Sequence, residues 1–363
     1  MEFKINKIEK IVFALLKISL HGESNEDVDW KNITSDEWDQ CYQLSAKHGV
    51  MALVWDGIQH VISECNLSRK LKLKWAVSVL NYEEKYTKYC QTAAKLSDIL
   101  AEHGIKMVQI KGVGLSSYYP IPSHREGGDI DIYTFSANKN VLSDEKANEL
   151  ANEIMKKQGI HVDTAHQKHS NFKFNGIPIE NHRSFVNTYT TSIGASINSL
   201  LLEVMQPKQT ALCNGNYQIL TPSPAFNFIF LPFHTAQHFG VEINLHHLFD
   251  WACLLKKEGW CLPNQPIDKR FLDFIYAMTY LSNQLLGTNI KVQGNDRLVQ
   301  DVYEQMMHSP YSEKLPVKGY WSIFYYKSKR LLYSYGMLRK VFDITIFKML
   351  KNSICFHIKK LIS

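Results

Sequence analysis

The segment Arg125–Ile132, with the sequence Arg-Glu-Gly-Gly-Asp-Ile-Asp-Ile, constrains this chain more than any other part. Asp129 and Asp131 alternate with Ile130 and Ile132, a period of two that predicts a short strand. Residues i and i+2 of a strand point to the same side, so the two carboxylates share one face while the isoleucines anchor the other in a core. Neighbouring carboxylates repel each other unless a cation lies between them. The pattern therefore predicts half of a Mg²⁺ site, completed by substrate phosphates.

A second motif lies upstream of the aspartates and predicts contact with phosphate. Residues 105–110 are an apolar-rich run that predicts a strand, and they lead directly into Lys111-Gly112-Val113-Gly114 and a short helical segment over 115–119. Glycines between a strand and a helix let backbone N–H groups approach a phosphate, and Lys111 supplies a positive charge. A lone Gly-x-Gly is typical of plain turns. A strand, a Lys-Gly turn, a helix, an arginine and an Asp-x-Asp strand form a much rarer order.

This order of motifs resembles the nucleotidyltransferase superfamily, whose members share a polymerase-beta-like core. More narrowly, it resembles a bacterial family labelled uncharacterised nucleotidyltransferase. The first motifs that carry the resemblance are Lys111-Gly112, Tyr119-Pro120, Arg125 and Gly128-Asp129-Ile130-Asp131. They are followed by Glu180 with His182 two residues later. The last are the Leu-x-x-His-x-x-x-His pattern of Leu231, His234 and His238, and the segment from His247 to Asp250. These motifs are specific in combination and cover the middle and later parts of the chain.

The resemblance implies an α+β fold, with a mixed-sheet nucleotidyltransferase core between N-terminal and C-terminal helical regions. It implies transfer of a nucleoside monophosphate from an NTP to a hydroxyl or phosphate, with Mg²⁺ or Mn²⁺ as cofactor, and leaves open whether the acceptor is a small molecule, a protein or RNA. Three sets of residues are implied: catalytic and metal-binding Asp129, Asp131 and Glu180; nucleotide-binding Lys111, Gly112, Gly114, Ser116 and Arg125; and substrate-contacting His182, His234 and His238.

One residue departs from the superfamily pattern. Val113 follows Gly112 where the superfamily carries a small residue that touches the triphosphate, so Gly114 or Ser116 would take that role. This departure supports an alternative function, a catalytically silent nucleotide-sensing or binding module on the same fold.

The superfamily completes its metal site with a third carboxylate from a neighbouring strand, and two glutamates compete for the role. Residues 172–174 and 177–179 predict two strands that turn at Asn175-Gly176, a dipeptide typical of hairpins. The second strand would carry Glu180 to the site. Glu203 lies in an apolar run over 196–205 that predicts a helix. We therefore favour Glu180.

Several other polar residues have two interpretations. Arg125 either binds a phosphate bidentately or neutralises the aspartates as a salt bridge. His234 and His238 have the spacing of zinc ligands on a helix, but without a third ligand nearby a packed pair is the more economical interpretation. The remaining histidines of the middle region, His161, His166 and His169, are interpreted as surface loop residues.

The organisation along the chain predicts three parts. Residues 1–104 predict a helical region, with a long amphipathic helix that ends at Gly104. Residues 105–220 alternate between strand-like and helical patterns and form the expected core. Pro222 and Pro224 mark the boundary to a second helical region over 221–363.

Composition excludes several classes of protein. An apolar content of 45% and a net charge of +6 are ordinary for a globular protein, and they permit polyanion binding without indicating a nucleic-acid reader. The seven cysteines include no Cys-x-x-Cys pair, and no apolar run is long enough to span a bilayer, so we expect a cytoplasmic protein. Oligomeric state is not predicted.

The tail from Lys327 to Lys360 mixes basic and aromatic residues. It suits a membrane surface, RNA or, as the simplest interpretation, a solvated amphipathic helix.

Overall fold

The computed structural model describes residues 3–23, 28–188, 191, 193–293, 295–311, 318–347 and 349. The helices of these ranges are α1 (Lys7–His21), η1 (Trp30–Asn32), α2 (Ser35–Lys47), α3 (Met51–Val61), α4 (Arg69–Ala101), α5 (Val113–Ser116), η2 (Pro122–His124), α6 (Asp144–Lys157), α7 (Gly194–Val204), α8 (Pro224–Gln237), α9 (Leu245–Glu258), α10 (Lys269–Leu286), α11 (Asp296–His308) and α12 (Tyr320–Val341). The strands are β1 (Ile105–Gln109), β2 (Ile130–Ser136), β3 (Val162–Asp163), β4 (His169–Phe174), β5 (Ile177–His182), β6 (Lys208–Leu212) and β7 (Tyr217–Thr221). The predicted α+β class is confirmed.

The strands form one mixed sheet in the order β3-β4-β5-β2-β1-β7-β6. β1 and β2 are antiparallel, whereas β5 runs parallel to β2 and β7 runs parallel to β1. The predicted hairpin between β4 and β5 is confirmed, because Asn175 and Gly176 both have positive φ angles, of 52° and 76°. Placing β2 in the middle of the sheet gives the aspartates a neighbouring strand on either side.

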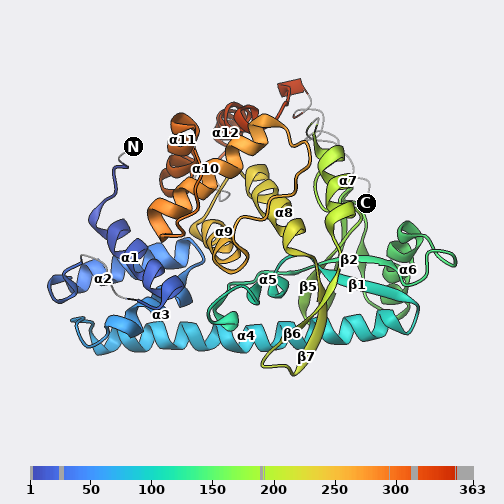
Figure 1. Ribbon diagram of the computed structural model, residues 1–363, viewed down its shortest axis with the longest axis horizontal. Helices are drawn as coiled ribbons and strands as arrows, with labels where there is room; N and C mark the ends of the chain where they lie inside the picture. The colour runs from blue at the N-terminus through green and yellow to red at the C-terminus, as the bar shows by residue number, and fades with distance from the viewer. Residues whose placement is uncertain are drawn as a thin grey trace.

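Helix α4 is the longest described helix, and it lies along the lower edge of the molecule in Figure 1. Its 33 residues extend over roughly 50 Å at 1.5 Å per residue. Trp75, in its first half, is buried and donates a hydrogen bond to the Met51 carbonyl of α3. Its second half packs on the sheet through buried residues that include Tyr86 and Leu96. One helix thus joins the N-terminal helices to the core.

The N-terminal and C-terminal helical regions share a hydrophobic core. Buried residues of α1 and α3 cluster with those of α8, α9, α10 and α11. Gly57 of α3 lies so close to α1 that a Cβ there would be 2.2 Å from the Leu15 carbonyl oxygen. Figure 1 shows α8 and α9 above α5, with α8 nearer the sheet. No helix in the described ranges is both long enough and apolar enough to cross a membrane.

A buried histidine ties the loop before β2 to two helices. His124 of η2 has its Nδ1 atom 2.8 Å from Asp56 Oδ1 of α3 and its Nε2 atom 3.1 Å from Glu83 Oε1 of α4. Burial opposes the charged imidazole, but the hydrogen bonds and charges of the two carboxylates raise the pKa of His124 above its ordinary value.

This raised pKa predicts a pH-dependent contribution to stability. The stabilisation by His124 should be complete below the ordinary histidine pKa of about 6.5 and should be lost as the pH rises through the raised pKa of the folded state. Urea unfolding should therefore show wild type more stable than His124→Gln by about 1–3 kcal/mol at pH 6, with a smaller difference at pH 9. A difference that grows between pH 6 and pH 9 would contradict the assignment.

Candidate active site

The carboxylates come together because two parallel strands lie side by side. Asp131 of β2 is the direct register partner of Glu180 of β5, and His182 lies two residues further along the same face of β5. Asp129 lies immediately before β2. Glu203, the competing candidate, is exposed on α7, where Gln265 donates to it over 3.5 Å. The structure thus brings Glu180, and not Glu203, beside the aspartates.

His182 occupies the space between the two strand carboxylates. Its Nε2 atom lies 3.1 Å from Asp131 Oδ1 and 3.4 Å from Glu180 Oε2, while its Nδ1 atom lies 3.3 Å from the Ser184 carbonyl oxygen. His169 lies on β4, 9% exposed, with Nε2 3.6 Å from Glu180 Oε2. The interpretation of His169 as a surface loop residue was therefore wrong, because the hairpin turns its ring onto the carboxylate face.

The opposite face of the same strands is fixed by a buried polar network. Asn148 of α6 donates to Asn181 Oδ1 over 2.9 Å and to the His182 carbonyl oxygen over 2.9 Å. Thr134 of β2 donates to Asn181 Oδ1 over 3.0 Å. Because these groups are buried and hydrogen-bonded, they fix the position of β5 against β2 and hence of Glu180 against Asp131.

Lys111 and Gly112 form the turn that faces the carboxylates. Lys111 Nζ lies 3.3 Å from Asp131 Oδ2. Gly112 has a φ of 65°, and a Cβ there would be 3.0 Å from the Asp129 carbonyl oxygen, so only glycine fits without strain. Lys168, which the sequence did not single out, is a second cation whose charge acts on Asp131, Glu180 and Asp129.

The surroundings shift the pKa values of the two aspartates in opposite directions. Burial and the charge of Asp131 raise the pKa of Asp129 to about 6. Burial acts in the same direction on Asp131, but the charge of Lys111 and a hydrogen bond from His182 prevail and hold the pKa of Asp131 below its ordinary value. Burial likewise opposes ionisation of Glu180, yet the hydrogen bond from His182 and the charge of His169 contribute to a lowered pKa. Lys111 acts on both aspartates, but only at Asp131 do the favourable interactions outweigh burial.

Arg125 forms an ion pair with Asp250 of α9 and not with Asp129 or Asp131. Its Nε atom donates to Asp250 Oδ1 and its Nη2 atom to Asp250 Oδ2, each over 2.8 Å, and Nη1 donates to the Gly112 carbonyl oxygen over 3.0 Å. Both side chains of the pair are 7% exposed. Tyr119 donates a further hydrogen bond to Asp250 over 2.6 Å. The guanidinium is thus largely committed to holding the turn, and a bidentate phosphate contact would require this pair to open.

Two other expected nucleotide contacts face away from the site. Ser116 is fully buried and donates to the Val113 carbonyl oxygen over 2.6 Å. A Cβ at Gly114 would be 2.7 Å from the Gln109 carbonyl oxygen, so this glycine allows α5 to pack against β1. Neither residue lines the pocket beside Lys111. A helix as short as α5 turns its second half into the core, and the spacing of the motif did not indicate this.

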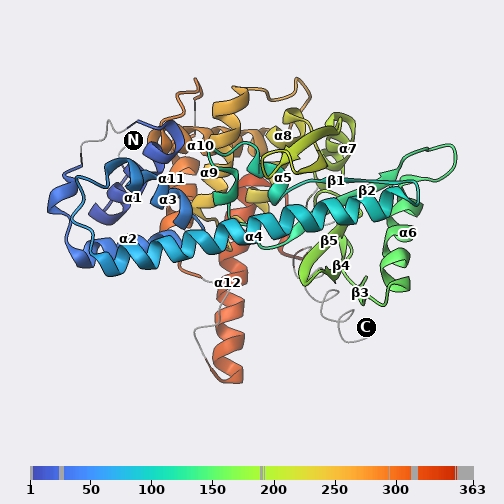
Figure 2. The same cartoon turned by 90° about the horizontal axis from the view of Figure 1, so that it is seen from below.

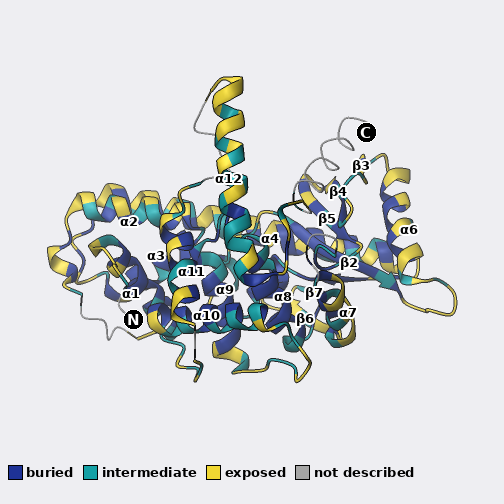
Figure 3. Cartoon of the chain, turned by 90° about the horizontal axis from the view of Figure 1, so that it is seen from above, coloured by how far each residue is buried: buried dark blue, intermediate teal, exposed yellow. Residues whose placement is uncertain are grey.

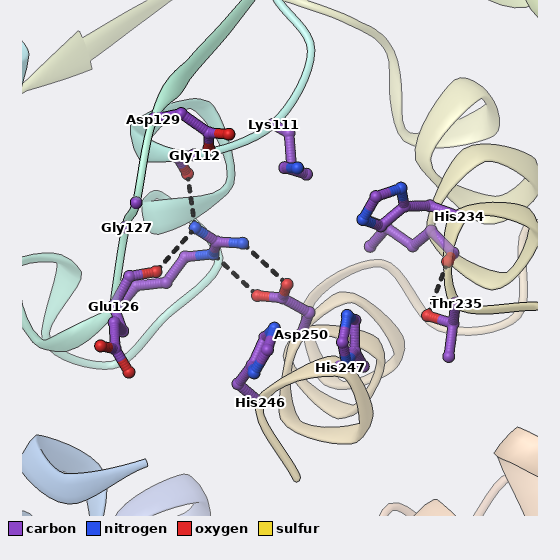
Figure 4. Close-up of a pocket in the computed structure, with 13 residues that line it drawn as sticks. Lys111, Gly112, Glu126, Gly127, Asp129, His234, Thr235, His246, His247 and Asp250 are labelled. Carbon is purple, nitrogen blue, oxygen red and sulfur yellow. Dashed lines mark hydrogen bonds and ion pairs between the residues drawn. The ribbon is translucent and has the colours of Figure 1, made fainter. Parts of the chain in front are cut away.

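Histidines from the C-terminal helices form the opposite wall of that pocket. Figure 4 shows His234 of α8 and His246 and His247 of α9 across from Lys111 and Asp129. His238 packs against His234 with ring centroids 4.9 Å apart. Burial and the charge of Lys111 lower the pKa of His234 well below its usual range, and burial together with Lys111 lowers the pKa of His238 to about 4. The imidazoles are therefore neutral at pH 7 and can both donate and accept hydrogen bonds.

A comparison with protein families decides which family this arrangement belongs to. A profile described as uncharacterised nucleotidyltransferase matches residues 34–287. The chain belongs to this family. Membership supports a general role in nucleotidyl transfer, and the match includes all the carboxylates and the pocket histidines described above.

Two further comparisons set this nucleotidyltransferase family member against curated proteins and solved structures. A search of curated proteins found no match. Among solved structures, the crystal structure of an antigenic nucleotidyltransferase-like protein from Paracoccidioides brasiliensis is similar, with 12% identity, 56% of this chain and 94% of that chain covered, and a TM-score of 0.34. A likeness at this level carries no conclusion about function.

Because of the ion pair with Asp250, we expect Arg125 to stabilise the folded protein. Arg125→Ala leaves the Asp250 carboxylate buried without its partner, so it should reduce the free energy of unfolding by about 3–5 kcal/mol in urea titrations. Arg270 is the matched control, because its side chain is 43% exposed and pairs with Asp268 and Asp343. Arg270→Ala should cost less than about 1 kcal/mol. Equal effects of the two substitutions would contradict the structural role.

The two aspartates of the family motif should respond oppositely to loss of charge in metal-free buffer. The pKa of Asp129 is raised, so its ionisation destabilises the fold as the pH rises from about 4 to 6, and Asp129→Asn should be more stable than wild type at pH 7 by about 1 kcal/mol. The pKa of Asp131 is lowered, so its ionised form stabilises the fold at pH 7, and Asp131→Asn should be less stable. Denaturation midpoints with EDTA present test both signs, and a shift in the same direction for both variants would show the charge assignment to be wrong.

Proposed function

We propose that the protein is a Mg²⁺- or Mn²⁺-dependent nucleotidyltransferase that transfers a nucleoside monophosphate from an NTP to a hydroxyl or phosphate of a small molecule, a protein or RNA. The observation that carries this proposal is the register pairing of Asp131 with Glu180 beside the Lys111–Gly112 turn. Carboxylates on adjacent strands next to a phosphate-binding cation suit phosphoryl and nucleotidyl transfer, where positioning and charge compensation supply most of the catalysis.

The residues fit a divalent cation. Oxygen or nitrogen atoms of Asp131, Glu180 and His182 lie within 4.8 Å of one another. Asp131 Oδ2 is buried and has no hydrogen-bond partner among the described residues, although Lys111 lies near it. Asp129 adds a fourth donor, and burial together with the charges of Asp131 and Glu180 raises its pKa. Asp129, Asp131 and Glu180 would form an all-oxygen set suited to Mg²⁺, with His182 hydrogen-bonding to Asp131 and orienting it.

A bound divalent cation would supply Lewis-acid stabilisation of the α-phosphate and would lower the pKa of an acceptor hydroxyl. Lys111 would contribute positive charge to the leaving phosphates, and its pKa is raised by the same carboxylates despite its burial. Gly112, which lines the pocket, leaves room for phosphates to approach the turn. His234, on the opposite wall, would hydrogen-bond to the substrate as a neutral imidazole, and His238 would support its ring.

Two pockets meet at Asp129, and the reaction needs two. One contains Lys111, Gly112 and the histidines. The other lies over the β4–β5 hairpin, where it is lined by Glu180, Asn171, Lys173 and Pro178 and lacks both Lys111 and Gly112. In-line displacement places the attacking and leaving groups on opposite sides of the phosphorus atom. We assign the first pocket to the phosphates and the second to the acceptor.

Substitution of Lys111 and Glu180 should separate their roles in turnover of NTP. Lys111→Ala should weaken NTP binding while Mn²⁺ binding, measured by calorimetry, is retained. Glu180→Gln should lower kcat and kcat/KM together by about a hundredfold or more, because a lost metal ligand acts in the transition state. Slow NTP hydrolysis serves as the assay, and Glu203→Gln is the control because its exposed side chain lies on α7, away from the aspartates.

Two results would count against the proposal. Loss of turnover in Glu203→Gln with full activity in Glu180→Gln would remove Glu180 from the site. Tight NTP binding without any turnover in wild type, with Mg²⁺ or Mn²⁺ present, would favour the catalytically silent binding module instead.

A further inference from the structure

Among the described residues, helix α12 contacts the body mainly through its C-terminal half, with one ring contact between Tyr326 and Tyr311 nearer its start. Ser334 donates to the Gly240 carbonyl oxygen over 2.5 Å, Tyr333 donates to Gln305 Oε1 over 2.8 Å, and Lys340 lies 2.6 Å from Asp301 Oδ2. These contacts belong to the C-terminal half of the helix. The N-terminal half projects away from the other helices, as Figure 2 shows, and it is largely coloured as exposed in Figure 3.

Helix α12 exposes large apolar side chains that no described residue covers, most of them in its projecting half. Tyr320 and Trp321 are each 77% exposed, Phe324 is 58% exposed, Tyr325 is 60% exposed and Leu332 is 58% exposed. At about 100° per residue, these five side chains fall in one sector roughly 140° wide. We call them the outer face of α12. Five large side chains gathered on one side of a helix mark an interaction surface more than scattered exposed residues would.

The charges that surround the outer face have one sign. From Lys318 to Phe342 the chain has six Lys and Arg residues and no Asp or Glu. By the same helical rotation, Lys327 and Lys329 lie at the two borders of the outer face. Lys329 Nζ lies over the Tyr325 ring, 4.5 Å from its centroid, so this cation contacts a side chain of the outer face. An apolar stripe bordered by cations on both sides complements a surface that is apolar inside and anionic outside.

We propose that the outer face of α12 binds the surface of a bilayer containing anionic lipids. Trp and Tyr favour the headgroup level of a membrane, where the ring is apolar on one side and hydrated on the other. A helix with an aromatic face and lysines at its borders lies in the plane of the interface, with the lysines reaching to the phosphates. Juxtaposed cations add electrostatic attraction to anionic lipids. This role is independent of nucleotidyl transfer.

Other occupants fit the outer face less well. A second copy of the chain would bring the cations of one α12 against those of the other, with no acidic residue in the segment to compensate them. Single-stranded RNA needs ring faces on which bases stack. Here the Tyr320–Trp321 and Trp321–Phe324 ring pairs are perpendicular, at 84° and 85°, and offer no continuous stacking platform.

Vesicle co-sedimentation of the full chain tests the proposal. Wild type should bind vesicles of phosphatidylcholine and phosphatidylglycerol in equal parts, and should bind vesicles of phosphatidylcholine alone much more weakly. Trp321→Ser combined with Phe324→Ser should weaken binding about tenfold or more through lost apolar burial. Lys327→Gln combined with Lys329→Gln should weaken it about tenfold or more on anionic vesicles only.

A matched control distinguishes binding by the outer face from non-specific hydrophobic binding by other exposed side chains. Leu73 and Leu80 of α4 are 57% and 56% exposed, and Leu73→Ser with Leu80→Ser should leave vesicle binding unchanged. All the substituted side chains are exposed, and urea unfolding of each variant verifies that the fold is retained. The proposal is overturned if wild type does not sediment with anionic vesicles, if the α4 variant loses as much binding as the α12 variant, or if the α12 substitutions abolish binding of a single-stranded oligoribonucleotide while vesicle binding is absent.

Discussion

The buried ion pair between Arg125 and Asp250 joins the parts from which the site is built. Arg125 precedes the aspartate strand, donates to the Gly112 carbonyl oxygen of the Lys111–Gly112 turn, and forms a bidentate pair with the carboxylate of Asp250 in α9. Two charges taken out of water require close, complementary partners, and Tyr119 supplies one more hydrogen bond to Asp250. The ion pair therefore links the segment before β2, the Lys111–Gly112 turn and α9, all of which line the pocket.

Charge compensation at the carboxylates is asymmetric, and this asymmetry suits transfer chemistry. Lys111 and His182 both act on Asp131, which stays ionised, while Asp129 keeps a raised pKa. A site already neutral would gain little from a cation, and one without any compensation would unfold or protonate. This difference keeps one buried carboxylate ionised beside another that protonates more readily. The neutral histidines opposite add hydrogen bonds without adding charge to the pocket.

Local sequence patterns predicted the parts of the site that depend on neighbouring residues. The alternation of Asp129 to Ile132, the Asn175-Gly176 hairpin and the Lys111–Gly112 turn all follow from strand periodicity and turn chemistry, and the structure confirms each of these elements. The patterns missed Lys168 and misplaced His169, because their positions depend on how a hairpin folds over the sheet.

What the sequence by itself determined is the alternation of carboxylates, the glycine that a positive φ requires and the family to which the motifs are similar, because these depend on residues a few positions apart. Only the tertiary structure decided which groups face one another. It paired Asp131 with Glu180 through a register across 49 positions, paired Arg125 with Asp250, and buried Ser116 against α4. Periodicity assigns a side chain to one face of its own element, but the partner on that face comes from packing between elements far apart in the chain.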